Sequence, residues 1–555
     1  MEKKNKNNVK YIFVTGGVCS GLGKGISIAS IGAILKSANY KIFTLKLDPY
    51  LNIDPGTMSP YQHGEVYVTD DGTETDLDLG HYERFIDTNL SKLSNLTTGQ
   101  VYQAVLNEER RGKFLGKTIQ IIPHITDEIK KYIYKAAKES QADILLIEIG
   151  GTVGDIEGEP FLETARQIRI EQGYHQCMFA HVTLLPYIKA SNETKTKPTQ
   201  LSVKELLRRG ISPDIIIART ETKISKEGIE KISMFCNVKP EAVIPAPTVK
   251  ILYEVPLNFE KSNISEIIYK QLKLTHRKPD LSSWSKLLNK IKKIEKKITI
   301  GLVGKYTENI DAYISVNEGL KSACYHNNLK LDLIWINSVK LEKNNRSEMS
   351  KLKKLDGLVV PGGFGSRGIE GKIKAAKYAR ENKVPYLGLC LGSQIMAIEY
   401  ARNVVGLKDA NSEEFNPKSE NLIVHYLPGQ SDAREKGGTL RLGACPCIVK
   451  KGTKAYEAYQ TNKISERHRH RYEFNNDYRE ILEKAGLVIS GDSPDHNLME
   501  IVEIKNHPFM LGSQFHPEFK SRPLRPHPLF MDFIKASEKY SPRIRSGEAG
   551  KNKKA

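Results

Sequence analysis

The chain has 555 residues, 39% of them hydrophobic, and a formal net charge of +19 at pH 7. That length exceeds what one hydrophobic core holds and predicts roughly two to four domains. Seven scattered cysteines exclude a disulfide-stapled scaffold, and Cys445 and Cys447 lack a second Cys or His pair at metal-ligand spacing. No apolar run approaches the length of a transmembrane helix, so we expect no membrane partner. The basic N-terminus is not followed by a signal sequence, so we expect a cytoplasmic protein.

The positive charge permits two interpretations. It could serve nucleic-acid binding, but the lysines are scattered over surface-like helices and no recognition motif accompanies them. We therefore expect no nucleic-acid partner, and an attraction for polyanionic nucleotides instead.

A glycine-rich segment near the N-terminus, Val14–Ser27, predicts a phosphate-binding loop. It follows an apolar run that is typical of a buried strand and precedes a helical pattern from about Ile26 to Lys36. Glycines let backbone N–H groups surround an anion, the helix dipole favours negative charge, and Lys24 adds a positive charge. The match to the standard loop is imperfect, because Val18 stands where a glycine is expected and Gly25 replaces the usual Ser or Thr. A merely tight turn is the alternative.

Apolar runs alternate with helical patterns along the first half of the chain. Parallel strands covered by helices have this alternation, and their ligands bind beyond the carboxyl ends of the strands. The predicted strands are Tyr11–Thr15, Ile42–Leu47, Ile144–Ile149, Met178–Leu185 and Asp214–Ala218.

Carboxylates follow two of these strands. The segment Lys46–Phe85 is polar, rich in acids and too long for an idle connection, and Glu148 ends the strand Ile144–Ile149. Glu148 and Asp78 could hold the Mg²⁺ of a nucleotide site. The alternative is that they cap turns.

Basic and hydroxyl side chains follow a third strand. Lys195, Lys197, Thr199 and Gln200 stand in a short loop just before a helical pattern, where they could clamp a second phosphate chain. A solvated run of charge is the alternative.

The composition changes near residue 275. Lysine-rich sequence with little strand character precedes a new strand at Ile298, after which the α/β alternation restarts. We therefore predict a first domain over residues 1–275, a linker over 276–297, a second domain over 298–540 and a basic tail over 541–555.

The second half carries a nucleophile pattern. Val384–Gln394 predicts a strand, a sharp turn with Cys390 at its apex, and a helix whose N-terminus lowers the pKa of the thiol. Leu355–Gly365 predicts a strand that ends in a glycine-rich turn. Downstream, His516 and Glu518 supply a base and its orienting carboxylate. A buried structural cysteine is the alternative.

These motifs resemble known families. Pro361–Gly365 (PGGFG), Gly388–Gln394 (GLCLGSQ) and Phe515–Phe519 (FHPEF) resemble the class I glutamine amidotransferases. Together with Lys46–Pro60 (KLDPYLNIDPGTMSP), Glu148–Glu157 (EIGGTVGDIE) and KTKPTQ, they resemble the CTP synthase family from about residue 11 to 534. The resemblance implies two doubly wound, three-layer α/β domains: a P-loop-like (dethiobiotin-synthetase-like) synthetase domain and a class I amidotransferase domain.

The resemblance also implies site residues. For ATP they are Gly21, Leu22, Gly23, Lys24, Gly25, Ile26, Lys46 and Asp78, with Pro247, Thr248 and Val249 at the adenine. For Mg²⁺ they are Asp78 and Glu148. For UTP, and for CTP as inhibitor, they are Ser20, Asp155, Ile156, Glu157, Lys195, Thr196, Lys197, Pro198, Thr199, Gln200 and Lys231. For glutamine they are Gly363, Leu391, Gly392, Ser393, Gln394, Glu414 and Arg471, beside the catalytic Cys390, His516 and Glu518. His63 and Val66 would line an ammonia passage, and Arg110, Arg111, Arg367 and Glu370 would serve GTP.

The implied activity is amination of UTP to CTP. ATP would phosphorylate the uracil 4-oxygen, and ammonia from glutamine, or free ammonia, would displace phosphate. The family further implies GTP activation, CTP inhibition and a homotetramer. Two alternatives stay open: an ATP-dependent amidotransferase that acts on a carboxylate, and a basic nucleic-acid or scaffold protein with a vestigial site.

Overall fold

The chain divides into two units, and each unit is built from two separate segments of the sequence. The computed structural model describes residues 9–427 and 439–541. The first unit comprises residues 1–54 and 78–288, and the second comprises 55–77 and 289–555. The division therefore falls within α11 (Ser282–Lys293), inside the segment predicted as a linker. Residues Pro55–Leu77 group with the second unit, whereas the sequence-based division assigned them to the first.

A seven-stranded parallel sheet forms the centre of the first unit. Each inner strand pairs in parallel with its neighbours, which requires a crossover connection between consecutive strands. In spatial order the strands are β11 (Val243–Pro247), β10 (Ile215–Thr220), β7 (Cys177–Leu185), β1 (Lys10–Gly16), β6 (Ile144–Ile149), β2 (Ile42–Asp48) and β5 (Asn95–Thr97).

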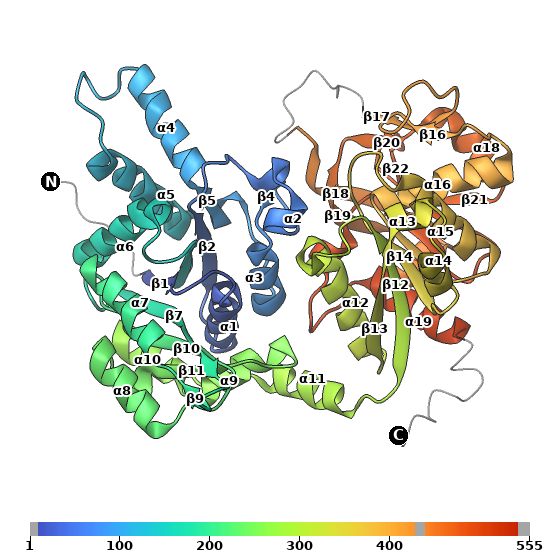
Figure 1. Ribbon diagram of the computed structural model, residues 1–555. Helices are drawn as coiled ribbons and strands as arrows, with labels where there is room; N and C mark the ends of the chain where they lie inside the picture. The colour runs from blue at the N-terminus through green and yellow to red at the C-terminus, as the bar shows by residue number, and fades with distance from the viewer. Residues whose placement is uncertain (1–8, 428–438, 542–555) are drawn as a thin grey trace. The chain divides into compact units, whose positions relative to one another are not determined.

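Helices cover both faces of this sheet, because alternate residues of each buried strand point to opposite sides. Leu145 and Ile147 pack with apolar side chains of α5 (Thr126–Ser140) and α6 (Glu159–Gln172). Leu146 faces Gly32 of α1 (Lys24–Ser37) on the other side. Figure 1 shows the two layers of helices around the strands. The other helices of this unit are α1 (Lys24–Ser37), α3 (Asp78–Ile86), α4 (Thr98–Arg110), α7 (Lys197–Arg208), α8 (Lys226–Cys236), α9 (Val255–Lys261) and α10 (Ile264–Leu272).

All five strands predicted in this half are confirmed within two residues at each end. The helix predicted from about residue 26 begins two residues earlier, at Lys24. The predicted long connection after β2 is not wholly irregular. It contains α2 (Pro60–His63), the short strands β3 (Tyr67–Val68) and β4 (Glu74–Thr75), and the start of α3.

A nine-stranded mixed sheet forms the centre of the second unit. Its first five strands are parallel and the rest are antiparallel. In spatial order they are β13 (Lys330–Asn337), β12 (Lys297–Gly304), β14 (Gly357–Val360), β15 (Tyr386–Leu389), β23 (Met510–Ser513), β22 (Met499–Ile504), β21 (Leu487–Asp492), β18 (Arg441–Val449) and β19 (Lys463–His470).

Two apolar cores lie on the two faces of the parallel part of this sheet. One joins β14 and β15 to α15 (Ile369–Glu381) and α16 (Leu391–Tyr400), and the other joins β12 to α12 (Ile314–His326) and α19 (Pro528–Tyr540). The remaining elements are α13 (Ser338–Glu342), α14 (Arg346–Leu352), α17 (Lys454–Tyr459), α18 (Arg479–Lys484), and the small sheet β16 (Asn411–Ser412), β17 (Leu422–Tyr426) and β20 (Tyr472–Phe474). The predicted pair of α/β units is confirmed, although the sheet of the second unit is parallel only in its first five strands.

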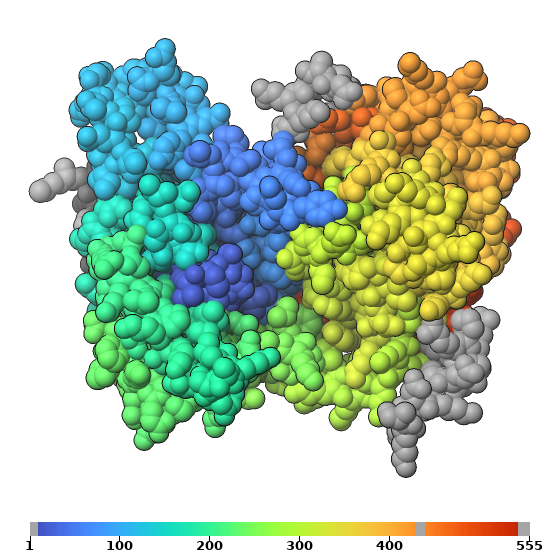
Figure 2. Space-filling view, viewed as in Figure 1, coloured from blue at the N-terminus to red at the C-terminus, as the bar shows by residue number. Residues whose placement is uncertain are grey.

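Apolar side chains are exposed on a projecting part of the first unit. The segment from α4 to about residue 122 forms the light-blue surface in Figure 2. Leu106, Leu115 and Ile122 on this segment are 57%, 89% and 53% exposed. No helix within the described ranges is long and apolar enough to cross a bilayer.

Candidate functional site

The loop between β1 and α1 has the backbone of an anion-binding turn. Val18, Gly21 and Gly23 adopt positive φ angles of 80°, 74° and 88°. A β-branched residue rarely adopts such an angle, so Val18 holds the conformation for which a glycine was expected. Gly23 then precedes the first turn of α1, whose free N–H groups and dipole favour a phosphate.

Two lysines lie at this loop, Lys24 at the start of α1 and Lys46 near the end of β2. Lys24 donates to the carbonyl of Gly151 at 2.6 Å. Lys46 pairs with Asp78 at 2.5 Å and lies 3.4 Å from Asp48. The structure thus brings Lys24, Lys46 and Asp78 together, as the sequence predicted for one nucleotide site.

Gly25 allows Asp78 to reach the start of α1. A Cβ added at Gly25 would lie 2.2 Å from Asp78 Oδ1, closer than any real contact. The departure from the standard loop sequence at Gly25 therefore has a steric reason. A Ser or Thr there would displace the carboxylate.

Asp78 and Glu148 form a pair of acids, of which Glu148 is buried and Asp78 is 24% exposed. Burial opposes ionisation of Asp78, but Lys46 outweighs it and holds the pKa of Asp78 below its ordinary value. Burial, followed by repulsion from Asp78, raises the pKa of Glu148 to about 7. Tyr82 donates to Glu148 at 2.5 Å. Two facing carboxylates that repel each other are a fitting site for a divalent cation.

No group of three or more His, Cys, Asp or Glu side chains forms a metal site within residues 9–427 and 439–541. A nucleotide-bound Mg²⁺ needs fewer protein ligands, because phosphate oxygens and water complete its shell. Asp78 and Glu148 fit this smaller requirement.

A mostly apolar cavity of about 280 Å³ adjoins the loop. It brings together both parts of the chain that were predicted for ATP. Arg219 and Asn258 also line it, and sequence reasoning did not select them. The predicted residues in its wall are Gly21, Leu22, Gly23, Ile26, Pro247, Thr248 and Val249.

A second, larger cavity of about 820 Å³ is lined by charged and polar side chains. Of the residues predicted for UTP, it collects Lys195, Thr196, Lys197, Gln200 and Lys231. Lys223 adds a further positive charge that was not predicted. The cavity suits a polyanion.

The other residues predicted for UTP do not line this cavity. Thr199 is buried and donates to the carbonyl of Leu184 at 3.0 Å. Asp155 accepts from the backbone N–H of Thr152 at 3.1 Å, and Ile156 is 80% exposed. Ser20, Glu157 and Pro198 likewise lie outside the cavity wall.

His181 is a buried residue of this unit that sequence reasoning missed. Its Nδ1 lies 2.9 Å from the hydroxyl of Thr15 and its Nε2 lies 2.8 Å from that of Ser202. Burial, with a smaller contribution from Lys24, lowers the pKa of His181 to about 3. Within β7 its only sequence signal is a polar residue in an apolar run.

In the second unit, Cys390 occupies the predicted sharp turn between β15 and α16. Its backbone has φ 50° and ψ −103°, and its N–H donates to the carbonyl of Ser513 at 2.7 Å. A Cβ added at Gly392 would lie 2.0 Å from the carbonyl oxygen of Val360. The turn is therefore too tight for a side chain at this position, which is typical of a nucleophile elbow.

His516 and Glu518 complete a buried triad. His516 Nδ1 lies 2.7 Å from Glu518 Oε1. Burial disfavours the imidazolium, but Glu518 and Cys390 outweigh it and raise the pKa of His516 to about 10. Burial likewise opposes the thiolate, and His516 with His470 outweighs it, so the pKa of Cys390 falls to about 6. The thiol and imidazole therefore favour an ion pair at neutral pH.

Gly362 lies against both reacting side chains. A Cβ there would stand 2.8 Å from His516 Cε1 and 3.6 Å from Cys390 Cβ. The predicted glycine turn thus approaches the thiol and the imidazole.

Of the residues predicted to bind glutamine, Glu414 and Arg471 offer opposite charges. Glu414 accepts from the N–H of Gly365 at 2.6 Å, and burial raises its pKa to about 7. Arg471 donates to Thr439 at 3.1 Å. Burial lowers the pKa of the nearby Lys372, which sequence reasoning did not select, to about 7.

The remaining glutamine candidates surround the elbow. Gly363 belongs to the glycine turn, and Leu391, Gly392, Ser393 and Gln394 form the first turn of α16. The side chain of Gln394 is buried and donates to the carbonyl of Tyr472 at 3.0 Å, so this side chain is engaged within the protein.

A cavity of about 240 Å³ adjoins the triad within the second unit. His516, Gly362 and Gly363 line one part of it, and the segment 55–77 supplies Met58 and Val66. Val66 was predicted to line a passage and does line this cavity, whereas His63 does not.

The residues predicted for GTP are divided between the two units. Arg110 and Arg111 end α4 in the first unit. In the second, Arg367 lies over the ring of Tyr306 at 5.7 Å, and Glu370 pairs with Arg402 at 2.9 Å.

Comparison with known proteins links both units to described families. Residues 10–274 match the family model of the CTP synthase N-terminus, and residues 308–536 match that of class I glutamine amidotransferases. The CTP synthase of Caldanaerobacter subterraneus subsp. tengcongensis is 57% identical over 95% of this chain and 98% of the relative. That of Bacillus subtilis is 55% identical over 95% and 98%. Among solved structures, the glutaminase domain of Trypanosoma brucei CTPS with bound acivicin is 41% identical and covers 44% of this chain and 94% of that one, with a TM-score of 0.41.

Proposed function

The chain belongs to the CTP synthase family, and we propose that its two units divide the reaction between phosphoryl transfer and ammonia production. It is a glutamine-hydrolysing ligase that converts UTP to CTP with ATP. The residues that carry each step are the proposal.

In the first unit, the loop at Gly21–Ile26 holds the ATP phosphates and Lys24 and Lys46 neutralise the transferring phosphoryl group. Asp78 and Glu148 would hold Mg²⁺, which when bound supplies further charge neutralisation. The γ-phosphoryl group moves to the uracil 4-oxygen and ADP leaves. Ammonia then adds to the ring carbon and phosphate departs. The lysine-lined cavity receives the triphosphate of UTP, and of CTP as a competing inhibitor.

In the second unit, the Cys390 thiolate attacks the carboxamide carbon of glutamine. The protonated His516 gives its proton to the departing ammonia and then takes one from the water that hydrolyses the thioester. Glu518 keeps the imidazole oriented, and the turn at Gly362 and Gly363 offers N–H groups to the oxyanion. The cavity lined by Val66 is the first part of a path for ammonia.

One observation carries this proposal: the strained Cys390 elbow beside a buried His516–Glu518 pair, with a thiol pKa of about 6. A structural cysteine would have its pKa raised by burial, as Cys177 and Cys324 have.

Assembly and regulation belong to the same proposal. We expect a homotetramer, because apolar side chains such as Leu115, Ile156 and Ile170 are more than two-thirds exposed on the first unit. Asp155, Ile156 and Glu157, which stand apart from the lysine-lined cavity, could then reach UTP in a partner. Activation of glutamine hydrolysis by GTP and a cytoplasmic location are further expectations from the family.

The test compares nitrogen sources in wild type and in Cys390→Ala. CTP formation from UTP and ATP is followed with glutamine and separately with ammonium chloride. We expect the variant to lose the glutamine reaction and keep the ammonia reaction. Loss of both would contradict the division between units, and absence of CTP in wild type with either source would favour an amidotransferase that acts on another substrate.

A further inference from the structure

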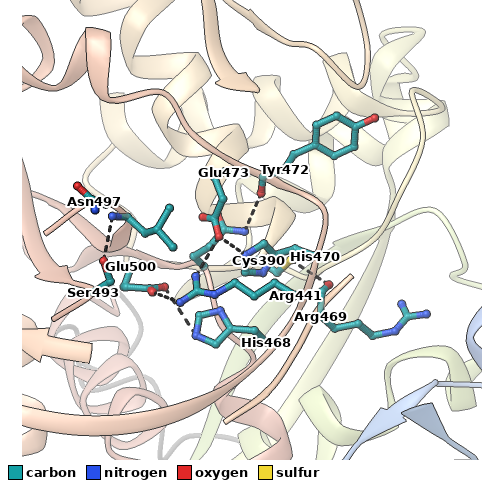
Figure 3. Close-up of polar contacts among 12 residues, drawn as sticks. Cys390, Arg441, His468, Arg469, His470, Tyr472, Glu473, Ser493, Asn497 and Glu500 are labelled. Atoms are coloured by element: carbon teal, nitrogen blue, oxygen red, sulfur yellow. Dashed lines mark hydrogen bonds and ion pairs between the residues drawn. The ribbon is translucent and has the colours of Figure 1, made fainter. Parts of the chain in front are cut away.

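A second histidine–glutamate pair lies beside the nucleophile. His470 ends β19, and Glu473 follows it in β20. His470 Nε2 lies 2.6 Å from Glu473 Oε1, and both side chains are at most 2% exposed. Figure 3 shows this pair next to Cys390.

The two histidines near Cys390 are arranged alike. His516 uses Nδ1 for Glu518 and His470 uses Nε2 for Glu473. The other ring nitrogen of each, Nε2 of His516 and Nδ1 of His470, is buried without a hydrogen bond of standard geometry among the described residues. Figure 3 shows His470 beside Cys390, and the electrostatic influence of both rings lowers the pKa of the Cys390 thiol. The sulfur also lies 3.9 Å from the carbonyl oxygen of Arg469, the residue just before His470.

A charged network behind the second pair fixes its protonation. Arg441 donates to Glu473 at 2.9 Å and to Glu500 at 2.6 Å. Burial disfavours the His470 imidazolium, but Glu473 and Cys390 outweigh it and raise the pKa of His470 to about 9. Burial, with Arg441, keeps the neighbouring His468 neutral by lowering its pKa well below its ordinary value.

The charged and titratable groups around His470 come from several neighbouring elements. Glu473 lies on β20, Arg441 on β18, Glu500 on β22 and His468 on its own strand. Cys390 lies at the elbow, and His516 lies between β23 and the short helix Pro517–Lys520. Glu473 is ionised, because His470 and Arg441 outweigh burial and lower its pKa.

We propose that His470, held by Glu473, is a second catalytic histidine that keeps Cys390 ionised while His516 transfers protons. The proposal rests on the role of Cys390 as nucleophile. During attack, the sulfur–carbon bond forms and the proton of His516 leaves with ammonia. His470 keeps its proton throughout, because its Nε2 donates to Glu473, which Arg441 also contacts. When the thioester is hydrolysed, the returning thiolate again meets a fixed positive charge.

The plain alternative is that His470 and Glu473 only join two strands. Titration of the Cys390 thiol distinguishes the catalytic role from this structural role. If the pair were only a structural link, its removal would leave the ionisation of Cys390 unchanged. Alkylation of the full chain by iodoacetamide is followed from pH 4.5 to 10, with Cys390 identified by peptide mass spectrometry because Cys19 is exposed and Cys445 is partly exposed. The pH midpoint of the rate reports the thiolate. This readout needs neither glutamine nor ATP.

The variants are His470→Gln, Glu473→Gln and His516→Gln, with His468→Gln as the matched control on the same strand. We expect a wild-type midpoint near pH 6, a rise of about one pH unit or more in His470→Gln, and a smaller rise in Glu473→Gln. In His516→Gln the pKa of the Cys390 thiol should stay partly lowered, because the imidazolium of His470 remains. His468→Gln should leave the midpoint unchanged, since a neutral ring is replaced by a neutral amide.

The proposal is overturned if the midpoint does not move in His470→Gln or if His516→Gln alone returns the thiol to an ordinary or raised value. Thermal unfolding identifies any variant that fails to fold, and His516→Gln then still tests the proposal, because it leaves the second pair intact. A Cys390→Ala variant that still hydrolyses glutamine would instead contradict the proposed function itself, so the two failures are distinguishable.

Discussion

The two sites differ in how far the protein alone completes them. Around Cys390, the thiolate faces two imidazoles, and each imidazole has its own carboxylate within 2.7 Å. Around Lys24, two acids repel each other, and the large cavity of the same unit is lined by four lysines together with Glu193 and Glu227. The second unit therefore holds a preorganised nucleophile, whereas the first offers a phosphate loop, a repelling pair of acids and a lysine-lined cavity, which suit a polyanion and a cation. The difference suggests that ligands organise one site and protein packing organises the other.

The largest expected effect concerns the preorganised site. Glu518→Gln removes the charge that raises the pKa of His516, so the imidazolium is lost at lower pH and burial then favours the neutral ring. We expect kcat for glutamine hydrolysis to fall about 10⁴-fold, with the alkaline limb of the pH profile displaced to lower pH. A glutaminase assay from pH 6 to 10 measures both. A profile that keeps its alkaline limb would show that Glu518 does not set the charge of His516.

The second prediction addresses the incomplete site. Lys24→Ala removes the charge at the start of α1, and we expect CTP formation to fall about a thousandfold with either nitrogen source. Glutamine hydrolysis measured without nucleotide should stay within about twofold of wild type, because the triad lies in the other unit. A loss confined to the glutamine-dependent reaction would contradict the assignment of Lys24 to phosphoryl transfer.

Gly25→Ala sharpens the same assignment through packing. The added methyl group would lie 2.2 Å from Asp78 Oδ1, so the carboxylate must shift and release Lys46. We expect ammonia-dependent CTP formation to fall about a hundredfold, as misplacement by about 1 Å can cause. Gly158→Ala is the control, because nothing lies within 4 Å of its added methyl group and its φ of −83° suits any residue. Equal effects in both variants would contradict the steric argument.

The sequence predicted the elements better than their grouping. Five strands followed from apolar runs, and the cysteine turn followed from its flanking glycines, because both signals are local. The assignment of residues 55–77 to the second unit depends on distant contacts, such as the hydrogen bond from Tyr67 to the carbonyl of Phe519, which have no local pattern.

The missed site residues are hidden for a related reason. His181 and Tyr82 lie within a strand and a helix whose residues are mostly buried. In the sequence they therefore cannot be told apart from residues of the hydrophobic core. His470 stands in the run Glu466–Phe474, whose alternation predicts a strand but not which of its basic residues faces Cys390. Only the fold brings these side chains to their partners.

The smallest expected effect concerns stability in the first unit. His181 is neutral and its folded-state pKa of about 3 lies below its ordinary value of 6.5. Above pH 6.5 neither state holds the extra proton. As the pH falls below 6.5, the unfolded chain binds a proton that the folded chain excludes, so the free energy of unfolding decreases until the pH nears 3. At pH 5 the loss is about 2 kcal/mol, roughly thirtyfold in the unfolding equilibrium.

His181→Gln removes this proton uptake, so the variant should lose less stability than wild type between pH 8 and pH 5, even where it is less stable at pH 8. Urea unfolding can be assigned to the first unit by Trp284 fluorescence in a Trp335→Phe background, since the chain has only these two tryptophans. His276→Gln, at a solvent-exposed histidine of the same unit, is the control and should keep the wild-type pH dependence. If the free energy of unfolding fell equally in His181→Gln and in wild type between pH 8 and pH 5, other groups, such as the carboxylates around Lys46, would control the acid sensitivity of this unit.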